Sequence, residues 1–134
     1  MTEDHRPPFP VPVEAPYLSL KTFRRNGRGV ATPVWFAADA QKLYVFSAGD
    51  AGKVKRLRRS SRAEVAVCDF RGNIESDWCE ATAELLSSPE DIRAAHRCLV
   101  EKYGWRARLL DIGAWISGRI DKRAWIAISF GASC

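Results

Sequence analysis

The chain has 134 residues, a formal net charge of +5, 46% hydrophobic residues and 28% charged residues. This length suits a single domain with one core, and this composition excludes a chain that is disordered throughout. Its apolar runs are far shorter than the roughly 20 residues of a membrane-spanning helix, and residues 1–10 lack the apolar stretch of a secretion signal. We therefore expect a cytoplasmic protein.

The chain changes character at Tyr17. Residues 1–16 contain five prolines, which favour extended and weakly ordered chain, so we interpret them as an arm ahead of a domain that covers residues 17–134. From Tyr17 to residue 23, apolar and polar residues alternate as they do in a strand. Asn26-Gly27 then predicts a hairpin turn, because both residues tolerate a positive φ.

Two further strands are predicted after this turn. The returning strand covers residues 30–38, and Pro33 within it cannot donate a hydrogen bond to a neighbouring strand. This indicates an edge, a bulge or a ligand at Pro33. Residues 43–47 are apolar on both faces and therefore predict a central strand.

The stretch AGKVKRLRRSSR, residues 51–62, contains six basic residues and no acidic residue. Val54 and Leu57 have the spacing of the buried side of a short helix, which we predict here. Lysine and arginine in the first turn of a helix are unfavourable, because the helix dipole already places positive charge there. Lys53 and Arg56 share one side of this helix, which favours an anion such as a phosphate between them.

Three interpretations of this positive charge compete. A small polyanion would suit Gly52, which has no Cβ and lets an anion approach the backbone. A solvated helix face would need no ligand. A nucleic-acid site would more often interleave exposed aromatic residues with the basic ones, and residues 51–62 contain no aromatic residue. We therefore place nucleic acid last.

The second half of the chain predicts more strands and helices. Ser88 followed by Pro89 and two acidic residues is typical of a helix start, and Gly104 of a helix end. The predicted elements are strands over residues 63–70, 74–86 and 124–130 and helices over residues 88–103 and 106–117, the last of which carries Leu109, Leu110, Ile112, Ala114 and Ile116. About six strands and three helices favour a small antiparallel β-barrel with appended helices.

The sequence lacks the usual patterns of metal-binding and catalytic residues. Cys68, Cys79, Cys98 and Cys134 have no C-x-x-C spacing, so no metal site is predicted. We interpret these cysteines as small buried hydrophobic residues and one free C-terminal thiol in a reducing compartment. No catalytic residue is identified, because there is no Ser-His-Asp set and no isolated pair of carboxylates. A cofactor must therefore supply the chemistry.

Three segments together resemble a known family. They are TFRRNGR at residues 22–28, TPVWF at residues 32–36 and YVFSAGDAGKVKRLRR at residues 44–59. These segments resemble the pyridoxamine-phosphate-oxidase-like split-barrel flavoproteins and, within them, the branch of reductases that depend on the deazaflavin coenzyme F420. The resemblance implies a mainly β fold with a six-stranded antiparallel split β-barrel, usually a homodimer with two cofactor sites at the subunit interface.

The resemblance also implies a set of cofactor-binding residues. The backbone of residues 32–35 would run along the cofactor ring, and Ser47 would supply a hydroxyl at the end of its strand. Lys53 and Arg56 would hold the cofactor phosphate, while Lys55 and Arg58 would reach the acidic tail that F420 carries and FMN lacks. The implied residues are Thr32, Pro33, Val34, Trp35, Ser47, Gly52, Lys53, Lys55 and Arg56.

We therefore expect an F420-dependent oxidoreductase that transfers a hydride between the bound deazaflavin and a small hydrophobic or conjugated acceptor. The alternative is an FMN-binding split-barrel protein that acts as an oxidase, a reductase or a flavin carrier. The excess of lysine and arginine favours the longer polyanion, since each acidic group could add a charge-assisted contact. A third hypothesis is a small barrel that binds nucleic acid, whose affinity would fall steeply with salt.

Overall fold

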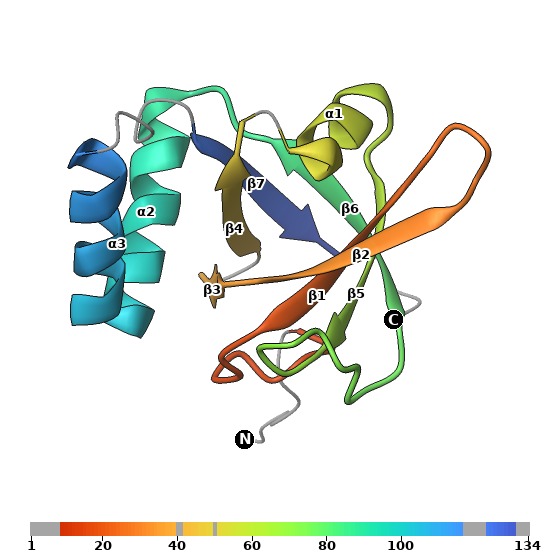
Figure 1. Ribbon diagram of the computed structural model, residues 1–134, viewed down its shortest axis with the longest axis horizontal. Helices are drawn as coiled ribbons and strands as arrows, with labels where there is room; N and C mark the ends of the chain where they lie inside the picture. Colours follow the sequence, from red (N-terminus) through yellow and green to blue (C-terminus); the bar gives the residue numbers. More distant parts are fainter. Residues whose placement is uncertain (1–8, 40–41, 50, 117–122, 131–134) are drawn as a thin grey trace, which may run out of the picture.

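The computed structural model describes residues 9–39, 42–49, 51–116 and 123–130. Within them, seven antiparallel strands form one sheet in the order β2-β1-β5-β6-β7-β4-β3, and three helices pack against it (Figure 1). The strands are β1 (Leu18–Phe23), β2 (Gly29–Val34), β3 (Phe36–Ala38), β4 (Leu43–Ala48), β5 (Arg62–Val67), β6 (Cys79–Leu85) and β7 (Arg123–Ser129). The helices are α1 (Gly52–Arg59), α2 (Pro89–Tyr103) and α3 (Trp105–Ile116).

The sheet curls because its two end strands are consecutive in the chain. β2 pairs with β1, β3 pairs with β4, and only Trp35 separates β2 from β3. This arrangement confirms a mainly β fold with a curled antiparallel sheet. The expected number of six strands is wrong, because the strand predicted over residues 30–38 changes its pairing partner at Trp35 and so becomes two strands.

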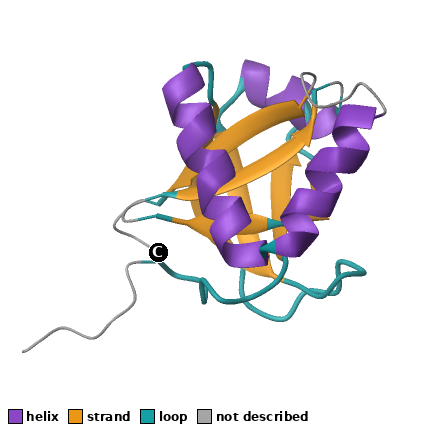
Figure 2. Ribbon diagram, turned by 90° about the vertical axis from the view of Figure 1, so that its left-hand side faces the viewer, coloured by secondary structure: helices purple, strands orange, loops and turns teal. Residues whose placement is uncertain are grey.

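Each face of β4 packs against a different apolar cluster. Leu43 and Val45 belong to the larger cluster, which also contains residues of β1, β5 and β7. Tyr44 belongs to a second cluster, which α2 covers with Ala95 and Leu99. Figure 2 shows the two long helices side by side over this outer face of the sheet. A central strand that is apolar on both faces, as predicted for residues 43–47, is therefore confirmed.

The predicted ends of α2 and of the first hairpin are confirmed. Ser88 caps α2 by accepting a hydrogen bond from the backbone N–H of Asp91, with Pro89 at the first helical position. Gly104 ends the helix with a φ of 60°. Gly27 in the first hairpin has a φ of 87°, a conformation that glycine adopts without steric cost.

Helix α3 forms as predicted, but most of its apolar side chains that the structure describes are exposed. Leu109, Leu110 and Ile112 are 57%, 41% and 54% exposed. Ala107 is buried, at 6% exposure. The side chains at positions 114 and 116 lie outside the described ones, as does residue 117. The apolar residues predicted a helix here, but α2 packs against a side of α3 other than the one that carries them.

The strand predicted over residues 74–86 begins only at Cys79. Before it, Asp69 closes a tight loop by accepting hydrogen bonds from the backbone N–H groups of Arg71 and Asn73, and Ile74 makes a single isolated bridge to Cys68. Cys79 is disulfide-bonded, so the interpretation of all four cysteines as reduced is wrong at this position. Cys68 and Cys98 are free.

Part of the proline-rich segment packs into the domain. Phe9, Val11 and Ala15 are buried in the larger apolar cluster. Lys102 and Tyr103 of α2 donate hydrogen bonds to the carbonyl oxygens of Ala15 and Pro16 at 2.7 and 2.9 Å. The described part of the arm, residues 9–16, is therefore held against the sheet. Among the described residues, no helix is long and apolar enough to cross a membrane.

Candidate cofactor site

Helix α1 presents positive charge at its start because its apolar residues anchor it to the sheet. Val54 and Leu57 are 0% and 7% exposed, as the sequence predicts. The N-cap is Ala51, which makes no side-chain hydrogen bond, and the first turn contains no acidic residue. The free backbone N–H groups and the cations of this turn are therefore not compensated by the helix itself.

Lys53 is half-buried beside the end of β4. Its Nζ atom donates a hydrogen bond to the Oγ atom of Ser47 at 3.3 Å, which is a neutral partner. It forms no ion pair with any residue that the structure describes. Burial lowers the pKa of Lys53, and the nearby charge of Arg56 lowers it further. The ammonium group therefore lies in a place that favours a negative ligand.

Arg56 folds back over the first turn of α1. Its Nε atom donates to the Oγ1 atom of Thr22 at 2.6 Å. A Cβ atom added at Gly52 would lie 2.8 Å from the Nη1 atom of Arg56, as expected for a long helical side chain that points toward the N-terminus. Burial lowers the pKa of Arg56, and the charges of Arg24 and Arg59 lower it further. Glycine at position 52 is thus what lets this guanidinium lie over the helix start.

Thr32 supplies a buried hydroxyl that lacks a partner. Its Oγ1 atom has no hydrogen-bond partner among the described residues. Thr32 pairs with Leu20 and Thr22 pairs with Val30, and residues directly opposite each other share a face of the sheet. Thr32 therefore lies on the same face as Thr22, which holds Arg56. An unpaired buried hydroxyl costs about 1–3 kcal/mol, so a ligand that bonded it would be favoured.

The other predicted residues of β2 and β3 have different surroundings. Pro33 is exposed and lies opposite Ser19. Val34 is buried in the larger cluster. The ring of Trp35 stacks on that of Tyr103 of α2, with centroids 4.3 Å apart and an angle of 8° between the planes. Tyr103 thus already covers one face of the Trp35 ring. A ligand at residues 32–35 would therefore contact their backbone.

We define the cation cluster as Thr22, Ser47, Lys53 and Arg56. Three of these residues, Ser47, Lys53 and Arg56, were predicted from the sequence, and the structure brings them together. It also places Gly52 against Arg56. Lys55 is exposed on α1. The sequence analysis missed Thr22, although a threonine that follows Leu18 and Leu20 on an apolar face was a signal for a buried polar contact. Two cations, two hydroxyls and a helix N-terminus can together bind a phosphate.

The sequence model of the pyridoxamine 5'-phosphate oxidase family matches residues 4–131. The chain belongs to this family. The match covers all of the described strands and helices, including β1, β4 and α1, which carry the residues of the cation cluster. It confirms the resemblance to the FMN-binding split-barrel proteins, a family that includes oxidoreductases. No curated protein is similar enough in sequence to match the chain.

Solved structures of low sequence identity share the fold. A pyridoxamine 5'-phosphate oxidase-related, FMN-binding protein of Nostoc punctiforme is 19% identical, with a TM-score of 0.60 over 87% of this chain and 71% of that protein. The heme storage protein HutZ of Vibrio cholerae is 12% identical, with a TM-score of 0.67 over 88% and 83%. ChuZ of Campylobacter jejuni is 11% identical, with a TM-score of 0.66 over 88% and 49%. At these identities the likeness concerns the fold alone.

Proposed function

We propose that this protein is an F420-dependent oxidoreductase that holds the cofactor phosphate between Lys53 and Arg56. One observation carries the proposal. Two neighbouring cations lie half-buried at the start of a helix, with hydroxyls and no acidic partner among the described residues. Such an arrangement is unfavourable in an empty protein and favourable around a phosphate, which accepts charge-assisted hydrogen bonds.

Each residue of the cluster has a distinct task in this proposal. Lys53 and Arg56 donate to the phosphate, and Ser47 and Thr22 hold their side chains in place. The backbone of residues 32–35 would lie along the ring, and the hydroxyl of Thr32, which has no partner among the described residues, would bond a polar atom of the cofactor. When bound, the reduced deazaflavin supplies a hydride. The protein's own contribution is to bind and orient the ring and to leave one ring face open for an acceptor.

A homodimer is also part of this proposal. The exposed apolar side chains of Trp105, Leu109 and Ile112 on α3 support an association that would cover them. The acceptor in this proposal is a small hydrophobic or conjugated molecule. Analytical ultracentrifugation tests the homodimer, and a monomer at all concentrations would contradict it.

The choice of F420 rests on the charge next to the cluster. Lys55 and Arg58 are exposed on α1, where they can pair with the acidic tail of F420. FMN is the second candidate, because the cluster is compact enough for a single phosphate and because the similar protein of Nostoc punctiforme is described as FMN binding. The two candidates differ only in the use of these exposed cations.

A titration with both cofactors side by side tests the proposal. We expect F420 to bind, Lys53→Gln to weaken both cofactors, and a double change of Lys55→Gln and Arg58→Gln to weaken F420 alone. If the double change leaves F420 affinity intact and FMN binds more tightly, FMN is the cofactor. If neither cofactor binds while an oligonucleotide does, with a steep dependence on salt, the redox function is wrong.

A cytoplasmic location stays a prediction of the sequence. The disulfide at Cys79 counts against it, because disulfides are rare in cytoplasmic proteins. Fractionation of the producing cells, with alkylation of free thiols before lysis, measures both the location and the state of Cys79.

A further inference from the structure

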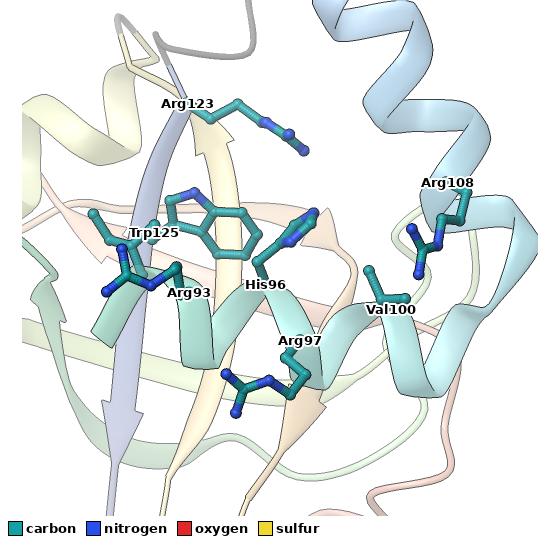
Figure 3. A pocket seen from close by; sticks show the side chains of 8 residues that line it. Arg93, His96, Arg97, Val100, Arg108, Arg123 and Trp125 are labelled. Atoms are coloured by element: carbon teal, nitrogen blue, oxygen red, sulfur yellow. The ribbon is translucent and has the colours of Figure 1, made fainter. Parts of the chain in front are cut away.

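A second cleft lies on the face of β4 and β7 that is opposite to the cation cluster. Ser47 pairs with Ala124, whereas Trp125 and Arg123 are the neighbours of Ala124 on either side, so their side chains point to the other face. The cleft has a volume of about 510 Å³ and lies between α2, α3 and β7 (Figure 3). Its polar and aromatic lining consists of Arg93, His96, Arg97, Arg108, Arg123 and Trp125.

The charge of this cleft is strongly positive. Four arginines line it, and none of the described residues that line it is acidic. Asp111 lies beside it, but its two carboxylate oxygens are already used. One is 2.7 Å from the Nε2 atom of His96, and the other accepts from the Nη2 atom of Arg123 at 2.9 Å. Arg93, Arg97 and Arg108 form no ion pair with a described residue.

Arg123 lines this cleft and has one hydrogen-bond donor without a described partner. Its side chain is only 9% exposed. Its Nε atom is buried and has no hydrogen-bond partner among the described residues, whereas buried polar groups in proteins are normally paired. Figure 3 shows its guanidinium directed over Trp125 toward His96. An acceptor atom of a ligand in the cleft would satisfy this donor.

The apolar lining of the cleft consists of Trp125, Ile92 and Val100. Trp125 is 6% exposed, so a small part of its surface faces the cleft. His96 meets the Trp125 ring edge-on at 5.6 Å between centroids, and the Cζ atom of Arg123 is also 5.6 Å from the ring. An apolar lining with a few polar groups at the rim is typical of small-molecule sites. The ligand should therefore combine a flat apolar body with a negative group.

We propose that this cleft binds a small aromatic carboxylate. The carboxylate accepts a hydrogen bond from the Nε atom of Arg123 and is attracted by the exposed arginines at the rim, and the aromatic ring packs on Trp125. A carboxylate is preferred because it is planar and continues the plane of an aromatic ring, and because guanidinium groups match it well. The site is separate from the cofactor site and does not rest on the proposed function.

Titration of the full chain with benzoate, followed by NMR, tests the inference. We expect saturable shifts of two signals, the indole N–H of Trp125 and the Nε–H of Arg123. Benzamide has the same shape without the charge, and acetate has the charge without the ring, so both should bind about tenfold more weakly or worse. Equal binding of benzamide, or no saturation by benzoate up to about 10 mM, would overturn the proposal.

Variants and a competition test locate the site. Arg123→Lys keeps a positive charge but removes the Nε–H, so benzoate affinity should fall about tenfold. If that variant does not fold, Arg108→Gln at the exposed rim should weaken benzoate severalfold, and Arg25→Gln in the distant hairpin should not. Saturating FMN or F420 should leave benzoate binding unchanged. Displacement of benzoate by either cofactor, or unchanged affinity in Arg123→Lys, would contradict a second site.

Discussion

The two positively charged regions of this protein lie on opposite faces of β4 and β7 and differ in what surrounds the charge. In the cation cluster, Lys53 and Arg56 donate hydrogen bonds to hydroxyls and form no ion pair with a residue that the structure describes. In the cleft under α2 and α3, Asp111 already pairs with Arg123 and His96. The charge of the first region has no acidic partner in the described part of the chain, whereas the second has an internal ion pair and one unused donor. The number of basic residues alone does not separate these cases.

The largest expected effect is on stability, in the cleft. Asp111→Asn should lower the free energy of unfolding by about 3 kcal/mol, because it removes a charge-assisted pair and leaves a mostly buried guanidinium without its anion. Urea denaturation measures this. Lys53→Gln is the matched control, and it should leave stability unchanged or raise it, because it removes one of two like charges. Equal destabilisation by both changes would remove the distinction between the two regions.

The next effect is on cofactor binding at the cation cluster. Lys53→Gln should weaken F420 and FMN about 10- to 30-fold, the size of a lost hydrogen bond to a charged group. Isothermal titration measures the affinity. Arg97→Gln in the cleft serves as the control and should not change it. If the change in the cleft weakened the cofactor as much as Lys53→Gln did, the cofactor would bind there.

A smaller effect is expected from Gly52→Ala. The added Cβ would push the guanidinium of Arg56 away from the helix start, so cofactor affinity should fall severalfold while the fold is retained. Gly113→Ala in α3 is the matched control, because a Cβ there meets nothing within 4 Å, and it should stabilise the helix by up to about 1 kcal/mol. Unchanged cofactor affinity in Gly52→Ala would show that cofactor binding does not depend on the position of the Arg56 guanidinium over the helix start.

The smallest effect is a difference in pH dependence. Burial and Arg56 lower the pKa of Lys53 from its usual 10.5, and a phosphate binds the protonated form. Cofactor affinity should therefore be highest below this lowered pKa and fall as the pH rises through it. Benzoate affinity in the arginine-lined cleft should stay constant over the same range, because guanidinium groups remain protonated. Parallel titrations between pH 7 and pH 10 compare the two sites, and equal losses would contradict the assignment of Lys53.

Local patterns were enough to predict several elements of the fold. Asn26-Gly27, Ser88-Pro89 and Gly104 each specify a backbone conformation through their own chemistry, and the structure has a turn or a helix end at each. The spacing of Val54 and Leu57 predicted both the existence of α1 and the side that it buries. For α3 the sequence predicted the helix but not the exposure of its apolar side chains, because apolar residues along a helix do not show whether another element covers them.

The candidate sites depended on contacts between distant segments. The sequence pointed to Lys53 and Arg56 from their place in one helix, but Thr22 joins them only because β1 passes under α1. In the cleft, Asp111 of α3 contacts both His96 of α2 and Arg123 of β7. No spacing along the chain relates these three residues, so the sequence analysis did not identify the cleft.

The sequence by itself determined the mainly β class, the position of α1 and the charge at its start, because turns, caps and periodicity act over a few residues. Only the tertiary structure decided that the strand over residues 30–38 splits at Trp35, that α3 leaves its apolar face exposed, and which basic residues find acidic partners. These outcomes depend on how separate elements pack, and the packing energy is shared among residues that are far apart in the chain.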